Sequence, residues 1–207
     1  MTQFSLFGNE AEPTIIPIQD GDLRYLNDFL TQDQADHYFA VLRDSLDWQQ
    51  DYIQMYGKRM KVPRLQAWYG SPESAHDYTN MSRHPQPMGQ ALNALRQQCE
   101  QICQVSFNGV LANYYRDGQD SVAWHADDEP ELHPQPLIAS VSLGEARDFD
   151  LRHNITRQRL RMRLEHGSLL IMAGTLQQYW QHTIAKSRTA QGARINLTYR
   201  YVYGPTA

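Results

Sequence analysis

The chain has 207 residues, a formal net charge of −4, 41% hydrophobic and 20% charged residues. These values are ordinary for a soluble globular protein of one large domain, and they disfavour a strongly basic nucleic-acid binder. No apolar run approaches the roughly 18 residues of a membrane span. The first residues lack the basic and apolar regions of a secretory signal. We therefore expect a cytoplasmic monomer without a membrane partner.

The first 13 residues are polar, contain proline and are expected to form a flexible tail. Within this tail, Gln3-Phe4-Ser5-Leu6-Phe7 places apolar residues where a core cannot use them. The segment either docks locally as a strand or binds a partner. It resembles the pentapeptide with which bacterial replication and repair proteins bind a sliding clamp. In the second interpretation Gln3, Leu6 and Phe7 anchor the partner, and in a bacterium the protein would associate with the nucleoid.

Two amphipathic helices are predicted in residues 14–105. Thr31 and Gln34 form a capping-box pattern, followed by apolar residues at helical spacing. The second helix is expected at about 87–104 and contains the two cysteines of the chain, Cys99 and Cys103. Their spacing offers no disulfide framework. We expect both thiols in the core of a protein from a reducing compartment.

A β-hairpin is predicted between the helices, at residues 48–64, with its turn near Tyr56-Gly57. Residues 71–87 are rich in Ser, Pro, His and Asn and indicate a loop. The hairpin carries one of two cationic clusters, which are Lys58, Arg59, Lys61 and Arg64, and Arg147, Arg152, Arg157, Arg159, Arg161 and Arg163. The clusters are either solvated faces of hairpins or two basic lips of a groove.

Short strand-like runs follow one another from residue 106 to residue 207, separated by turn signals such as Asp117-Gly118. The runs are 108–116, 121–126, 136–143, 147–153, 158–164, 167–173, 179–184 and 193–203. Repeated short strands are typical of a sandwich or barrel, here of the jelly-roll kind. The fold class is therefore mainly β (α+β), with 106–207 as its core, and the whole chain is expected to form one structural domain.

One predicted strand near the C-terminus alternates polar and apolar residues without interruption. Residues of one parity share a face in a strand. The polar face carries Arg194, Asn196, Thr198 and Arg200, and the apolar face carries Ile195, Leu197, Tyr199 and Tyr201. Two guanidinium forks held in register suit a small dicarboxylate, although a solvated strand face is the alternative.

His125 and Asp127 stand one residue apart at the end of a strand-like run, so both side chains can reach one ion. His182 on a later strand can supply a third ligand. Two imidazoles and one carboxylate on a β scaffold form the facial triad of non-haem Fe(II) oxygenases. The absence of cysteine and of further carboxylates argues against structural zinc and against calcium or magnesium. The alternative for His125 is an ordinary hydrogen-bonded histidine.

The order of these motifs resembles the AlkB family of Fe(II)- and 2-oxoglutarate-dependent dioxygenases. His-x-Asp is followed about fifty residues later by His and then by Arg-x-Asn-x-Thr-x-Arg, and the family's Asn-x-Tyr is matched by Asn113-Tyr-Tyr115. The resemblance covers most of residues 50–203. Several local runs are similar to the DNA-repair branch: Pro63–Gly70, His125–Glu129, Ile138–Ser142, Arg147–Phe149 and His166–Leu170.

The resemblance implies a double-stranded β-helix (jelly roll) at 106–207 and an N-terminal nucleotide-recognition lid within 14–105. It implies that His125, Asp127 and His182 hold Fe(II). It also implies that 2-oxoglutarate is held by Asn113, Tyr115, Arg194, Asn196, Thr198 and Arg200. We expect one arginine at the far carboxylate, with Arg194 favoured, and the other nearer the iron.

The implied reaction uses O2 and 2-oxoglutarate to remove methyl groups from 1-methyladenine and 3-methylcytosine in DNA, with release of succinate and formaldehyde. Residues expected near the base are Tyr69, Tyr78, Asp128, Glu129 and His153. The resemblance assigns a wedge role to Tyr56 at the hairpin tip, and phosphate contacts to the neighbouring cations Lys58, Arg59, Lys61 and Arg64. One departure is Asn80, at a position that is aromatic in similar sequences.

Two other functions stay open from the sequence. The first is an oxygenase with the same cofactors that acts on RNA, on a protein or on a small molecule. The second is a jelly-roll protein that binds DNA lesions without catalysis, and an acidic surface at Asp128 and Glu129 would then be an exposed turn.

Overall fold

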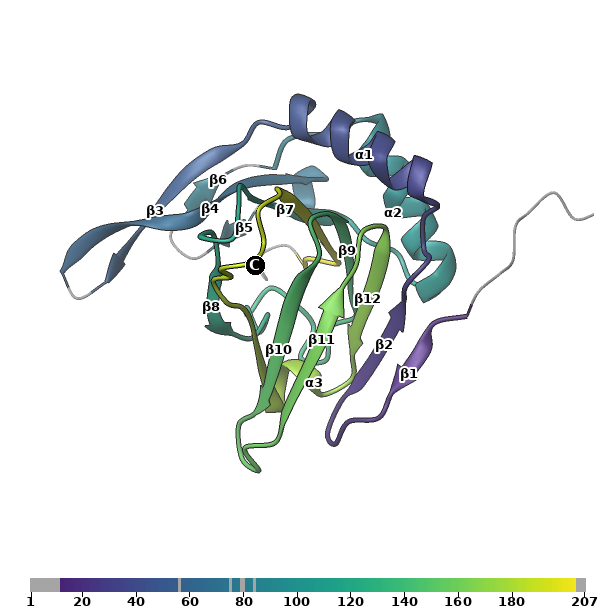
Figure 1. Ribbon diagram of the computed structural model, residues 1–207, viewed down its shortest axis with the longest axis vertical. Helices are drawn as coiled ribbons and strands as arrows, with labels where there is room; N and C mark the ends of the chain where they lie inside the picture. Colours follow the sequence, from purple (N-terminus) through teal and green to yellow (C-terminus); the bar gives the residue numbers. More distant parts are fainter. Residues whose placement is uncertain (1–11, 56, 75, 79–80, 84, 204–207) are drawn as a thin grey trace, which may run out of the picture.

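Two antiparallel sheets pack against each other in a computed structural model of the chain (Figure 1). The structure describes residues 12–203, except 56, 75, 79–80 and 84. The larger sheet has the order β1 (Thr14–Ile16), β2 (Asp22–Leu26), β12 (Ser168–Ala173), β9 (Ile138–Gly144), β14 (Arg194–Arg200), β7 (Gly109–Tyr115), β4 (Lys58–Gly70) and β3 (Gln49–Met55). The smaller sheet has the order β11 (Arg159–Leu164), β10 (Arg147–His153), β13 (Trp180–Ile184) and β8 (Val122–His125). The predicted mainly-β jelly roll is confirmed.

Two helices cover the outer face of the larger sheet (Figure 1). They are α1 (Gln32–Ser45) and α2 (Gln90–Cys103). The predicted capping box begins α1, since the Thr31 hydroxyl accepts from the Gln34 N–H and the Gln34 amide accepts from the Thr31 N–H. Cys99 is buried and Cys103 half-buried against the same apolar core, as predicted.

β14 lies between β9 and β7 and has two chemically different faces. Ile195, Leu197 and Tyr199 are fully buried in the core beneath the helices. The Tyr199 hydroxyl also donates a hydrogen bond to the Leu92 carbonyl of α2 (2.9 Å). Of the four residues predicted for the apolar face, Tyr201 was wrongly placed. It follows the end of the strand and is 45% exposed.

The N-terminal part of the chain contributes more strands than the sequence predicts. β2 pairs with β12 and β4 pairs with β7, so strands from both halves of the chain share one sheet. The predicted loop at 71–87 contains a short 3-10 helix (Pro72–Ser74) and the small hairpin of β5 (His76–Tyr78) and β6 (Met81–Arg83). A one-turn helix, α3 (Leu176–Tyr179), precedes β13. Among the described helices, none has the length and apolar character to cross a membrane.

The predicted cationic cluster on β10 and β11 is compensated in part. Arg147 is 2% exposed and donates hydrogen bonds to the carbonyls of Asp117, Asp120 and Ala185, so it holds loops together inside the protein. Arg161 and Arg163 form ion pairs with acidic residues of β10, directly across the strand pair. Arg161 and Arg163 therefore belong to a mixed-charge surface, while Arg157 and Arg159 of the same cluster are exposed.

Candidate metal and cosubstrate site

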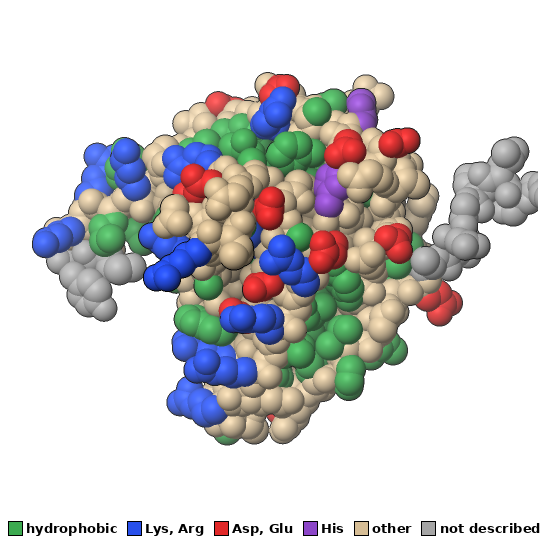
Figure 2. Space-filling model, viewed as in Figure 1, with side chains coloured by type: hydrophobic (Ala, Val, Ile, Leu, Met, Phe, Trp, Pro, Cys, Tyr) green, Lys and Arg blue, Asp and Glu red, His purple; other side chains and the backbone are tan. Residues whose placement is uncertain are grey.

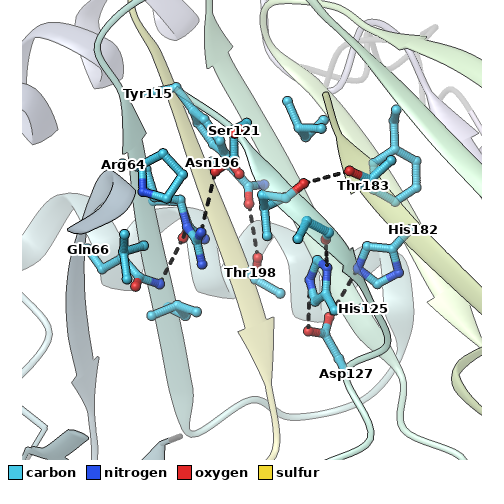
Figure 3. A pocket seen from close by; sticks show the side chains of 18 of the residues that line it. Arg64, Gln66, Tyr115, Ser121, His125, Asp127, His182, Thr183, Asn196 and Thr198 are labelled. Atoms are coloured by element: carbon cyan, nitrogen blue, oxygen red, sulfur yellow. Dashed lines mark hydrogen bonds and ion pairs between the residues drawn. The ribbon is translucent and has the colours of Figure 1, made fainter. Parts of the chain in front are cut away.

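Three candidate metal ligands meet where β8 and β13 pair (Figure 3). His125 and His182 are cross-strand partners, with ring centroids 4.2 Å apart. Asp127 follows β8, and its carboxylate oxygens lie 3.8 Å from His125 Nε2 and 3.9 Å from His182 Nε2. The three potential ligand atoms lie within 4.8 Å of one another, so one ion could contact all three.

A hydrogen bond at His125 and burial at His182 prepare the two imidazoles to bind a metal. His125 Nδ1 lies 2.8 Å from the Ala123 carbonyl, which can only accept, so Nδ1 donates to this carbonyl and Nε2 is the nitrogen that faces Asp127. Burial lowers the pKa of His182 to about 3, and the neighbouring His125 acts in the same direction against the attraction of Asp127. His182 is therefore uncharged at neutral pH.

The Asp127 carboxylate is ionised although it is buried. Burial acts to raise its pKa, but the positive charges of Arg200 and Arg64, together with the adjacent imidazoles, outweigh this effect, and the pKa is lowered. The donor set is thus two imidazoles and one anionic carboxylate, without sulfur. This combination fits Fe(II) with positions left for other ligands.

The ligands open into a cavity of about 810 Å³ between the two sheets. Arg200, which is 1% exposed, lies close to the metal ligands, 3.7 Å from Asp127 and 3.5 Å from Glu129. Arg194 lies at the opposite end of β14. The polar face of β14 therefore spans the cavity from the metal ligands to Arg194.

The Arg194 guanidinium is buried, and only some of its N–H donors have a hydrogen-bond partner. Its Nη2 donates to the Ser142 hydroxyl (2.9 Å), and its Cζ lies 5.2 Å from the Tyr115 ring centroid. Its Nε and Nη1 atoms are buried without a hydrogen-bond partner within the described part of the chain. Burial lowers the pKa of Arg194 to about 10. Unsatisfied donors on a buried cation fit a carboxylate ligand such as one end of 2-oxoglutarate.

The remaining predicted cosubstrate residues also lie on the cavity wall (Figure 3). Asn196 donates to the Ser140 hydroxyl (2.8 Å), and Thr198 donates to the Asn196 amide oxygen (3.1 Å). Asn113 Oδ1 accepts hydrogen bonds from Arg64 Nε (2.7 Å) and Gln66 Nε2 (3.1 Å). These contacts fix the side chains of the wall in one arrangement.

Arg64 and Gln66 are wall residues whose position the sequence analysis missed. Arg64, predicted as a phosphate contact, is half-buried and lines the cavity, where its charge contributes to the low pKa of Asp127. Side chains alternate between the two faces of β4, so Arg64 and Gln66 lie on the same face of the strand. This alternation could have predicted their position.

The predicted base-contacting acids occupy different environments. Glu129 lines the cavity beside Arg200. Asp128 is exposed and is not among the residues that line the cavity. Only Glu129 is therefore placed to contact a molecule inside.

Tyr69 and His153 lie away from the cavity. Tyr69 is buried beneath the helices, where its hydroxyl accepts from the Asp47 N–H (2.9 Å). His153 is 1% exposed. Its Nδ1 accepts from the N–H groups of Ile155 and Thr156, and its Nε2 lies 3.2 Å from the Asp20 carboxylate. His153 therefore stabilises the turn after β10.

The β3–β4 hairpin projects from the body (Figure 1), residues of both its strands line the cavity, and Lys and Arg side chains gather over it (Figure 2). Lys58, Arg59 and Lys61 are exposed, and Lys61 also lines the cavity. The Arg59 guanidinium stacks over Tyr52, 4.1 Å from the ring centroid. Tyr56, Asn80, the Tyr78 side chain and the motif of Gln3, Leu6 and Phe7 lie outside what the structure describes.

The sequence matches a family model, described as the 2OG-Fe(II) oxygenase superfamily, over residues 22–200. Alpha-ketoglutarate-dependent dioxygenase alkB homolog 3 of Bos taurus is 38% identical over 185 residues, which cover 84% of this chain and 64% of that protein. The human protein named DNA oxidative demethylase ALKBH2 is 34% identical over 180 residues, 82% of this chain and 69% of its own length. The chain thus spans less than two thirds of the bovine relative. A solved structure of OsALKBH1, 19% identical, superposes with a TM-score of 0.64 over 91% of this chain and 100% of its own.

Replacing Asp127 with Asn should abolish tight metal binding, because the ligand set loses its one anionic donor. Even changes next to a metal ligand weaken binding about 10–100-fold, so we expect a loss of at least about 100-fold. Titration with Co(II), followed by visible absorption, measures this effect. The matched control is Asp128→Asn, which removes a neighbouring exposed carboxylate and should change the affinity less than about twofold. Equal losses in the two variants would contradict the assignment.

Proposed function

Since the chain belongs to the 2OG-Fe(II) oxygenase superfamily, whose cofactors are Fe(II) and 2-oxoglutarate, we propose that it is an enzyme that demethylates alkylated bases in DNA. The proposed substrates are 1-methyladenine and 3-methylcytosine. One observation carries the proposal: a single cavity contains the three candidate metal ligands and the two buried arginines of β14. The name of the human relative, DNA oxidative demethylase ALKBH2, supports the choice of substrate.

In this proposal His125, Asp127 and His182 hold Fe(II), and Arg194 and Arg200 bind the cosubstrate. When bound, the two cofactors supply the oxidation of the substrate by activating O2. In the net reaction one oxygen atom of O2 enters succinate and the other enters the methyl group, while 2-oxoglutarate loses carbon dioxide. The hydroxymethylated base then releases formaldehyde. The chain contributes fixed positions for both reactants, which is the usual role of protein groups around a cofactor.

The two arginines have different proposed roles. Arg200 lies 3.7 Å from Asp127, so it would bind near the metal end of the cosubstrate. Arg194 has unsatisfied donors at the far end of β14, so it would bind the distant carboxylate, with Tyr115 beside it. Asn113, Asn196 and Thr198 would keep the wall between them in place.

Glu129 is the proposed acceptor for the exocyclic amine of the base. Its carboxylate lines the cavity next to the metal ligands, and 1-methyladenine and 3-methylcytosine are cations that an anionic acceptor attracts. A base inside a duplex cannot reach this cavity unless it is flipped out of the stack. We propose that Tyr56 at the hairpin tip fills the gap left by the flipped base and that Tyr78 forms one wall of the base pocket.

The exposed hairpin cations support DNA as the macromolecular partner. Lys58, Arg59 and Lys61 lie on the element that overhangs the cavity, and Arg59 is held by stacking on Tyr52. Phosphates beside a flipped nucleotide would meet these side chains. The overall charge of −4 does not oppose this arrangement, because the local distribution of charge decides where a phosphate backbone binds.

A separate proposal concerns the N-terminal motif. We propose that Gln3, Leu6 and Phe7 bind a sliding clamp, which would bring a repair enzyme to newly copied DNA. The support is the sequence pattern alone.

Oligonucleotides that carry 1-methyladenine or 3-methylcytosine, single-stranded and duplex, should lose the methyl group when incubated with protein, Fe(II), 2-oxoglutarate and O2. Mass spectrometry of the oligonucleotides and a formaldehyde assay measure the reaction. His125→Ala should remove both the demethylation and the slow conversion of 2-oxoglutarate to succinate without substrate.

The same assay separates the other functions. Conversion of 2-oxoglutarate without demethylation of any DNA would indicate another substrate, and RNA oligonucleotides of the same sequences test the nearest one. No conversion of 2-oxoglutarate by the metal-loaded protein would indicate a non-catalytic binder.

Replacing Lys58 and Arg59 with Ala should weaken DNA binding and reduce its salt dependence. Each lost phosphate contact reduces the slope of log affinity against log salt by about 0.9, so we expect a change of about 1.8. Fluorescence anisotropy at several salt concentrations measures the slope. The control is the double variant Arg161→Ala and Arg163→Ala, since both arginines are already paired with carboxylates. Similar slopes in the two double variants would argue against the hairpin as the phosphate contact.

Replacing Leu6 and Phe7 with Ala should remove binding to the cognate sliding clamp, because these residues supply the apolar anchors. A titration of labelled clamp with the full chain measures the affinity. The control is Ser5→Ala, which changes the small residue of the same segment and keeps all of its apolar side chains. If the double variant binds as the wild type does, the motif has no role in clamp binding.

A further inference from the structure

Asp127 lies outside the β ladder that positions the two histidines. The last pair between β8 and β13 is His125 with His182, and Asp127 comes two residues later, in a segment without regular structure. Cross-strand pairing therefore fixes both imidazoles but not the carboxylate. The contact that holds the Asp127 backbone is a hydrogen bond from its N–H to Gln177 Oε1 (3.0 Å), and it is buried.

Gln177 is itself held rigidly. It is 3% exposed and belongs to α3, whose flanking residues Leu176 and Trp180 are fully buried. The amide nitrogen of Gln177 faces Met172 Sδ at 3.7 Å, a weak acceptor on the cavity wall. With the nitrogen directed at the sulfur, the amide oxygen is directed at Asp127. The orientation of this side chain is thus determined at both of its polar atoms.

We propose that Gln177 is a positioning residue that sets the place of the Asp127 carboxylate relative to the two histidines. The inference rests on the proposed role of His125, Asp127 and His182 as metal ligands. One continuous segment, α3 followed by β13, then positions all three ligands. It carries His182 directly, it aligns His125 by strand pairing, and it holds Asp127 through Gln177.

Metal affinity depends on small displacements of ligands, because a site binds well only when its donors are held within a few tenths of an ångström of the required geometry. Residues that orient ligands typically change metal affinity about 10–100-fold when they are replaced. Loss of the Gln177 oxygen would leave the Asp127 N–H without its acceptor, and the segment would be free to move the carboxylate.

The neighbouring residue provides a matched control. Gln178 lies on the same helix, and its amide donates to the Pro134 carbonyl (2.9 Å) at the other end of the segment between β8 and β9. The same substitution at position 178 therefore removes one hydrogen bond to the same segment, but not the bond at Asp127. If metal affinity falls only when position 177 is changed, Gln177 positions Asp127. If it falls equally at both positions, the two glutamines merely stabilise the loop.

The test is a Co(II) titration of the full chain, followed by visible absorption, which reports both affinity and ligand geometry. Gln177→Met keeps the length and volume of the side chain without the oxygen, and it should bind Co(II) about 10–100-fold more weakly, with an altered spectrum. Gln178→Met should match the wild type within about twofold. Gln177→Glu keeps an acceptor oxygen at the same reach and should restore the wild-type spectrum.

Unchanged affinity and spectrum in Gln177→Met, or equal losses in Gln177→Met and Gln178→Met, would overturn the positioning role. If Gln177→Met does not fold, Gln177→Asn replaces it, since this change withdraws the amide by one methylene and should also weaken binding. A wild-type chain that binds no Co(II) would overturn the proposed metal site together with the role of Gln177. Binding by the wild type with no effect at position 177 would overturn only the positioning role.

Discussion

Arg194 and Arg200 are buried on the inner face of β14, and a buried cation is unfavourable unless an anion or strong hydrogen bonds compensate it. At one end of the strand Asp127 and Glu129 provide that compensation for Arg200. At the other end Arg194 relies on Ser142 and the face of Tyr115, and burial lowers its pKa to about 10. The cavity is consequently a place where an anionic ligand gains more than it would at the surface, because the protein has already desolvated the cations that receive it.

The strand pattern of the core could be predicted because alternation is a local property. For β14, every second residue from Ile195 to Tyr199 lies under the helices as the pattern indicates. The prediction fails where pairing depends on distant residues. β1 and β2 are short, and they become strands because β12 offers an edge to pair with, which no nearby residue reveals. Tyr201 has the right parity, but the strand ends before it, and parity alone cannot place that end.

The candidate site likewise contains residues that the sequence reveals and residues that it does not. The ligands His125, Asp127 and His182 have side chains with evident metal chemistry, and they stand in a recognisable order. Arg64 and Gln177 have no such signature, since an arginine next to other cations resembles a surface residue and a glutamine in a short helix resembles a solvent-facing one. Two residues that the resemblance places near the base lie away from the cavity in the structure. Tyr69 lies on the helix side of β4, and His153 is held by hydrogen bonds from its own turn and by Asp20.

The position of α2 affects how readily the two cysteines can be oxidised. An enzyme that handles ferrous iron and O2 risks oxidising its own thiols, and the thiolate is the form that reacts. Burial raises the pKa of Cys103 to about 12, and it also raises the pKa of Cys99 well above its ordinary range. Both sulfurs also face an apolar core, on the far side of the larger sheet from the candidate ligands. The only two cysteines of the chain are thus kept in the unreactive thiol form, and the sheet that carries the arginines also shields them from the chemistry of the cavity.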